Sequence, residues 1–445
     1  MARVLLFTGG ARSGRENAID ALAAEHWGRS LLVVPTRHEA GKRAARIVES
    51  SNLAGAWDVC AVSFEDLALR LLRDAGIFPH MLDETERRSV IVRAVDRLRS
   101  GGKLDALGDA AGSAGFANHM LRVVTKLKQA AVNPAEFRDV VARRERGSWL
   151  DSIVADVYEA YQEMLHRADA YDRVGVYWRA HVVLGEKKPQ FFDRARCVLF
   201  DGFDDFTPSE FRVIEQMSRH VDLLVFGLAC DPEAASQRDL YSAPLRTMNQ
   251  LRGAFHAMEA RSFSEPPPAT RIAFVTSHLF WRDRPQPPKS PKENLALQPC
   301  HDRMHECEWM GRMAKSLIVE QGVAAENIAL VFRGLEDVAP RLRVVFDEFQ
   351  IPATLHAPRT LLDSSFVRFL VRLLDVGAIW ERECVLDVLT SRWSGPSTGP
   401  AAAFGYLARI AGVIEGKREW MGCAQRLRAW LREGSGEHRD HILQR

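Results

Sequence analysis

The chain has 445 residues, of which 47% are hydrophobic and 27% are charged, and its formal net charge is +2. This composition is typical of a globular protein, and the length predicts about two to four domains. A charge so close to zero gives no bulk attraction to nucleic acid, so any contact with DNA would need a local basic patch. No apolar run reaches about 18 residues, so no membrane-spanning helix is expected.

Seven cysteines are scattered along the chain without the spacing of a metal site. We therefore predict no metal site, and we expect the cysteines to be buried as small apolar side chains. An odd number without a disulfide framework fits a reducing compartment, so a cytoplasmic protein is expected.

Apolar runs separated by helix-length segments open the chain and predict a parallel α/β sheet. From residue 65 to residue 180 nearly every stretch has helical periodicity instead, and strands then return. The sequence thus predicts one sheet domain, 1–64 and 181–263, interrupted by a helical insertion, 65–180. The runs that predict strands are Val4–Phe7, Leu31–Pro35, Trp57–Val62, Cys197–Asp201 and Val221–Leu228.

A proline-rich passage at 264–296 predicts an exposed linker. Beyond it, a strand at Ile328–Phe332 followed by a helix at Val338–Phe349 predicts the start of a second α/β domain, 297–376. The remaining residues, 377–445, read as a helical segment without the signs of a finished domain, and Lys417–Glu433 is amphipathic.

The first predicted strand leads into a glycine loop and then a helix, which is the setting of a phosphate-binding P-loop. Gly9 and Gly14 have the spacing of G-x-x-x-x-G-K-[ST], but Arg15 stands where the lysine belongs and Glu16 where the Mg²⁺-binding hydroxyl belongs. A guanidinium is a poor substitute for an ammonium, and a carboxylate would repel a triphosphate. We therefore predict a degenerate loop that is retained as scaffold.

The acidic residues that complete such a site, at the end of another strand, are also incomplete. Asp201 ends a predicted strand and would hold Mg²⁺ through water, but the next position is Gly202. No side chain remains there to activate an attacking water. Asp204 and Asp205 follow too far along the chain and are expected in a solvated turn.

The run from Leu199 to Glu210, LFDGFDDFTPSE, resembles the signature of the B-type component of AddAB (RexAB) helicase–nucleases. Thr207 and Pro208 in it are suited to begin a helix. More broadly the chain resembles the superfamily 1 helicase fold of the UvrD type, in which a Glu occupies the position of Gly202. The resemblance implies P-loop-like parallel-sheet domains with a large all-helical insertion.

Further segments resemble the same family in the same order along the chain. By resemblance, Thr36 with Arg37, and Ser63 in SFEDLA, occupy corners that contact DNA phosphate. Arg333 follows a strand that resembles the first strand of a second motor domain, at the position of an arginine that reaches toward the γ-phosphate. With Arg15 opposite, that role is expected to be vestigial.

The resemblance implies a non-motor subunit that binds DNA ends with a single-stranded tail during double-strand-break repair and recombination. Its expected partner is the A-type helicase/nuclease subunit, and no catalytic residue is expected in this chain. Neither the family's nuclease site nor the cysteines of its iron–sulfur cluster can be found, so no cofactor is expected and the chain reads as an N-terminal portion. Glu186-Lys187-Lys188, the one E-x-K string, lies in a polar turn.

Two other functions stay open at this point. One is a divergent ATPase or helicase that uses Arg15 in place of lysine. The other is a pseudo-ATPase scaffold without DNA binding. Basic helix positions such as Arg88 and Arg97 could also lie against DNA, although a solvated face is the simpler interpretation.

Overall fold

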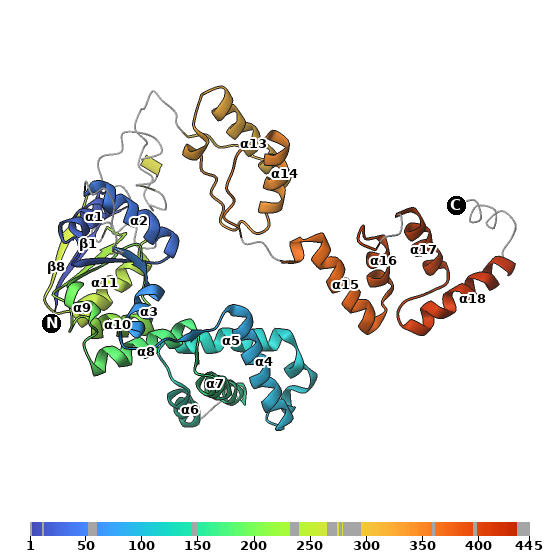
Figure 1. Cartoon of the computed structure of the whole chain (residues 1–445), viewed down its shortest axis with the longest axis horizontal. Helices are drawn as coiled ribbons and strands as arrows, with labels where there is room; N and C mark the ends of the chain where they lie inside the picture. The colour runs from blue at the N-terminus through green and yellow to red at the C-terminus, as the bar shows by residue number, and fades with distance from the viewer. Residues whose placement is uncertain are drawn as a thin grey trace. The chain divides into compact units, whose positions relative to one another are not determined.

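The computed structural model describes residues 2–10, 13–51, 60–144, 149–231, 240–264, 274–275, 278, 295–357, 361–394 and 398–433. Contacts divide the chain into two units, Met1–Ala296 and Leu297–Arg445 (Figure 1). The division falls where the predicted proline-rich linker ends, while most of the linker itself lies outside the described residues. None of the described helices is both long enough and apolar enough to span a bilayer.

Unit 1 is built on a six-stranded parallel sheet with the strand order β3-β2-β6-β7-β1-β8. Its central strands are continuous apolar runs because helices cover both faces, and every residue of β2 and β6 is buried. The predicted α/β fold is therefore confirmed. The strands are β1 (Arg3–Thr8), β2 (Ser30–Val34), β3 (Ala61–Ser63), β6 (Cys197–Phe200), β7 (Leu223–Leu228) and β8 (Met258–Ser262).

Two of these strands differ from the prediction. β3 is shorter, and part of the predicted run, 57–59, lies outside the described residues. β8 is an edge strand that the sequence did not indicate, because its residues, MEARS, are largely exposed and lack an apolar pattern. Pairing with β1 alone defines it.

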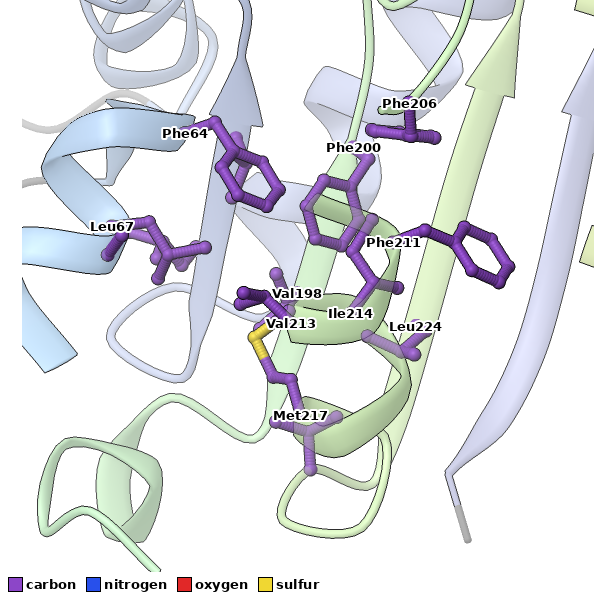
Figure 2. Packing of buried hydrophobic residues seen from close by; sticks show 14 of the residues in the cluster. Phe64, Leu67, Val198, Phe200, Phe206, Phe211, Val213, Ile214, Met217 and Leu224 are labelled. Carbon is purple, nitrogen blue, oxygen red and sulfur yellow. The ribbon is translucent and has the colours of Figure 1, made fainter. Parts of the chain in front are cut away.

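Alternate residues of the strands face two helical layers. On one face α1 (Arg15–Glu25) and α2 (Arg37–Ser50) bury Ile19, Ala23 and Ile47 against β1 and β2. The other face packs against α3 (Phe64–Asp74), α8 (Arg173–Glu186), α10 (Pro208–Met217) and α11 (Ser242–Ala254). Figure 2 shows this second core, in which Phe200 lies among Phe64, Phe206 and Ile214. A short helix, α9 (Phe191–Arg194), precedes β6.

The helical insertion has a core of its own. It comprises α4 (Glu84–Ser100), η1 (Asp105–Gly112), α5 (Ala114–Gln129), α6 (Pro134–Arg143) and α7 (Trp149–Arg167). Two short parallel strands, β4 (His80–Met81) and β5 (Ala170–Tyr171), join its ends. α3 and the start of α8 lie within the range 65–180, but both pack against the sheet and belong to its covering layer.

Helices are the only regular structure among the described residues of unit 2. Cys307, Leu342 and Phe346 lie in its first core. The predicted strand at Ile328–Phe332 is wrong: the segment has no regular structure, and Val331 is 89% exposed. A strand needs a neighbour for its backbone hydrogen bonds, and no strand occurs among the described residues of this unit. The helices are α13 (Arg303–Val319), η3 (Ala325–Asn327), α14 (Ala339–Phe349), η4 (Leu361–Asp363), α15 (Ser365–Ile379), α16 (Arg382–Thr390), α17 (Thr398–Ile410) and α18 (Lys417–Glu433).

Candidate functional site

The glycine loop lies between β1 and α1, as the spacing predicts. Gly14 has a φ of 81° and directly precedes the helix, and a Cβ on Gly9 would overlap the side chain of Ser13. The Ser13 hydroxyl donates to the carbonyl of Gly10 at 2.8 Å. Both glycines are therefore required by the turn itself, whether or not it holds a phosphate. Ala11 and Arg12 lie outside the described residues.

Arg15 points into the protein instead of toward the solvent side of the loop. The residue is 3% exposed, and its Nη2 lies 3.3 Å from Oδ1 of Asp201 and 3.7 Å from Oε1 of Glu16. A positive charge that is neutralised inside the fold is not available to a triphosphate. The loss of phosphate binding by this loop stays a prediction.

Asp201 directly follows β6 and is fully buried, with both carboxylate oxygens facing arginines. Oδ1 faces Arg15, and Oδ2 accepts a hydrogen bond from Nη1 of Arg43 at 2.7 Å. Arg43 also donates from Nε to Asp20 at 2.7 Å, and Asp20 lies 2.7 Å from Nη2 of Arg46. The strand end is thus the centre of a chain of alternating charges.

The charge of Arg43 is maintained by its partners. Burial alone would lower the pKa of this guanidinium, but the ion pairs with Asp201 and Asp20 outweigh burial and raise the pKa. Burial also raises the pKa of Asp20, although Arg43 opposes the shift. The charged guanidinium of Arg43 therefore hydrogen-bonds to the carboxylate of Asp201, the group that would hold Mg²⁺. Mg²⁺ keeps a near-octahedral shell of oxygen ligands, and the groups around Asp201 do not fit it.

Asp20, Arg43 and Arg46 of this network escaped the sequence analysis, although a signal for Arg43 is present. Arg43 lies on the same face of α2 as Ala40 and Ile47, so a charged residue occurs on an apolar helical stripe. Such a charge is rarely buried without a partner. The network also requires Gly227 in β7, because a Cβ there would overlap the carboxylate of Asp201. No local pattern indicates it.

A glutamate at the position of Gly202 would be strained. Its φ is 81°, and a Cβ at this position would lie 2.9 Å from Oε1 of Glu39 and 3.1 Å from Cδ of Pro35. A left-handed backbone conformation is unfavourable for residues with a Cβ. The turn after β6 therefore favours glycine through its backbone conformation as well as through the space around it.

We expect Gly202→Ala to lower the free energy of unfolding by about 1–2 kcal/mol, which is the strain of a left-handed non-glycine residue. Gly202→Glu should cost at least as much because it also brings a carboxylate against Glu39. Urea denaturation would measure both. Gly253→Ala is the matched control, since Gly253 lies in α11 with open space around its Cβ position.

Combining Arg15→Lys, Glu16→Thr and Gly202→Glu should not restore nucleotide binding, and tight binding of an ATP analogue by this variant would contradict the assignment.

The turn that follows Asp201 has the features that the sequence predicts. Asp204 and Asp205 are exposed. Thr207 begins α10 with a reciprocal capping box in which its side chain and that of Glu210 satisfy each other's backbone N–H groups, and Pro208 follows at the first helical position.

The three residues predicted to contact DNA lie at the carboxyl ends of β2 and β3. Thr36 and Ser63 begin α2 and α3 as N-caps, with their hydroxyl oxygens accepting from the N–H groups of Glu39 at 3.2 Å and Asp66 at 3.1 Å. Arg37 donates from Nε to Oδ2 of Asp66 at 2.9 Å. The fold therefore brings the three together at one edge, and their contact with phosphate stays a prediction.

Arg333 lies in unit 2, exposed in a bend after the irregular segment 328–332. Arg15 and Asp201 belong to unit 1, so the approach of Arg333 to them also stays a prediction.

The sequence of most of unit 1, including the glycine loop, matches one family of known proteins. A family model for the N-terminal part of ADDB matches residues 8–271, more than half of the chain. The chain belongs to the AddB family. A relative from Clostridium novyi, named as the B-type subunit of an ATP-dependent helicase/deoxyribonuclease, is 20% identical over 88% of this chain and 35% of its own length. A Bacillus subtilis relative of the same name is 24% identical over 80% and 32%, and one from Desulforudis audaxviator is 26% identical over 73% and 29%.

This AddB chain spans about a third of the length of the curated relatives it matches. Six of its seven cysteines are buried. Within the described ranges, no three or more His, Cys, Asp or Glu side chains are grouped to hold a metal ion.

Proposed function

We propose that this AddB-family chain is part of the non-motor, B-type component of an AddAB-type helicase–nuclease, and that it binds DNA ends with its own ATP site inactive. The observation that carries the inactive site is the double engagement of Asp201 by Arg15 and Arg43. Each oxygen that could hold a hydrated Mg²⁺ already faces a guanidinium. Nucleotide would have to displace two buried ion pairs before any metal could bind.

The proposed partner is an A-type subunit that carries the active motor, and the proposed substrate is a duplex end with a single-stranded tail. The names of the relatives, which describe one component of a larger enzyme, support membership of such a complex. The DNA-binding edge would be formed by Thr36, Arg37 and Ser63 at the carboxyl ends of β2 and β3. Helix N-termini there direct backbone N–H groups outward, which suits phosphate. The proposed role is in double-strand-break repair and recombination.

The test is binding of the purified chain to a labelled duplex end with a short single-stranded tail, with and without ATP, across a salt series. We expect binding that weakens steadily as salt rises and that does not respond to ATP, because phosphate contacts release counterions. DNA-stimulated ATP turnover that is lost on Asp201→Ala would overturn the inactive site and support a divergent ATPase. Absence of binding even at low salt would overturn DNA binding and support a scaffold.

A further inference from the structure

Two exposed arginines from distant parts of the sequence share one carboxylate beside the proposed DNA-binding edge. Nε of Arg173 lies 2.7 Å from Oε2 of Glu65, and Nη2 of Arg37 lies 3.5 Å from Oε1 of the same residue. The side chains of Arg37 and Arg173 are 67% and 68% exposed, whereas that of Glu65 is 20% exposed. Glu65 therefore lies between two cations that face solvent, one of which, Arg37, also pairs with Asp66 at 2.7 Å.

The position of Arg173 is set by a buried ion pair. Arg173 is the first residue of α8, and Asp172 caps this helix by accepting from the N–H of Gly175 at 2.7 Å. The other oxygen of Asp172 accepts from Nζ of Lys128 at 2.8 Å, at a site where Lys128 is fully buried. The start of α8 is thus anchored to α5 of the helical insertion, and Arg173 emerges from a fixed point.

The space beside Arg173 is concave. A cavity of about 470 Å³ is lined by residues of the helical insertion and of the sheet layer, among them Glu65, Arg87, Thr125, Gln129 and Arg173. The acidic side chains in its wall are already engaged: Glu84 pairs with Arg87, Asp83 caps α4 and Asp172 pairs with Lys128. The cavity therefore leaves room for a nucleotide beside Arg173.

We propose that Arg173 binds a backbone phosphate of the single-stranded tail together with Arg37, and that the carboxylate of Glu65 occupies this phosphate position in the free protein. The proposal rests on the DNA-binding function proposed above and adds a residue from the helical insertion's border to its contact set. Exposed ion pairs contribute little to stability. A phosphate can therefore replace Glu65 between the two guanidiniums at small cost, while Glu65 turns toward solvent.

A purely structural role for the Arg173–Glu65 pair predicts a different pattern from a phosphate-binding role. If the pair only supports the edge, removing either member should weaken DNA binding. If Glu65 competes with phosphate, removing Arg173 weakens binding and removing the charge of Glu65 strengthens it. The direction of the Glu65 effect therefore decides between the two roles.

The experiment compares the full chain with Arg173→Ala, Arg173→Lys, Arg37→Ala and Glu65→Gln in binding to a tailed duplex over a salt series. Arg173→Ala should weaken binding roughly two- to fivefold and reduce the slope of log K against log salt by about 0.7, the value for one single-strand phosphate contact. Arg173→Lys should keep most of the slope, and Glu65→Gln should raise affinity by a similar factor. Thermal melting of each variant checks that unit 1 is folded.

Matched controls come from the amino-terminal ends of the central strands β6 and β7, whereas the proposed DNA-binding edge lies at the carboxyl ends of β2 and β3. Arg196 and Asp222 form an exposed pair there, with Nε of Arg196 2.8 Å from the carboxylate, so Arg196→Ala and Asp222→Asn should leave DNA binding unchanged. If Arg173→Ala behaves like Arg196→Ala, or if Glu65→Gln weakens binding, the inference is wrong while the DNA-binding function stands. If the unmodified chain fails to bind at low salt, the proposed function fails and the inference fails with it.

Discussion

Replacing Asp201 with alanine is expected to lower the free energy of unfolding of unit 1 by about 3–5 kcal/mol, the loss typical of removing one partner from a buried ion pair. The variant leaves Arg15 and Arg43 buried beside a cavity, with only Asp20 and the half-exposed Glu16 to balance them. Thermal unfolding of the full chain, with hydrogen exchange at the amides of β6 and β7, would measure the loss in this part of the fold.

The sign of this effect separates the two roles of Asp201. A carboxylate kept for a metal is surrounded by other oxygen ligands, so removing it in the absence of metal relieves repulsion and stabilises the fold. A carboxylate kept for two arginines does the opposite. Asp204→Ala is the control, because Asp204 lies three residues along the same turn and is exposed. An unchanged or raised melting temperature for Asp201→Ala would contradict the internal-cation assignment.

Replacing Lys128 with methionine is expected to have an effect of similar size, about 3–5 kcal/mol, because it leaves Asp172 buried without its cation. Lys128 contacts Asp172 and Gln162, and its backbone carbonyl accepts from Nε1 of Trp178 at 3.1 Å and from the hydroxyl of Ser209 at 2.6 Å. The residue thus lies where α5, α8 and α10 meet. Urea denaturation would report the loss.

The pH dependence of Lys128→Met is a separate prediction of the same ion pair. In the unmodified chain, burial would raise the pKa of Asp172, but the ion pair with Lys128 outweighs burial and the pKa is lowered. That stabilisation is present above the ordinary pKa of an aspartate and is lost as pH falls through the lowered one. In the variant burial acts without Lys128, so the pKa should rise and the deficit should shrink as pH falls.

The control for this pair is the double variant Lys128→Met with Asp172→Asn. Asparagine keeps the helix cap of α8 and removes the buried charge, so the double variant should recover much of the stability lost in Lys128→Met. A double variant that is as unstable as the sum of the single changes would show that the two residues act independently.

The sequence by itself determined the α/β class and most of the element positions. In unit 1 the continuous apolar runs predicted strands buried on both faces, and Thr207 with Pro208 predicted the start of α10 from local backbone chemistry. The loss of the phosphate-loop residues was also readable, since Arg15, Glu16 and Gly202 are identities at known spacing. These features depend on neighbours along the chain, which a sequence shows directly.

Only the tertiary structure decided which side chains surround Asp201 and Glu65. Arg43 reaches Asp201 from α2, Arg173 reaches Glu65 from α8, and Gly227 makes room for a carboxylate on the adjacent strand. The error at Ile328–Phe332 has the same cause, since a strand forms only beside a pairing partner. The described residues of unit 2 contain no strand with which this apolar run could pair. Ion pairing and strand pairing both depend on partners far away in sequence, and their free energies are set by burial and distance, which the fold alone defines.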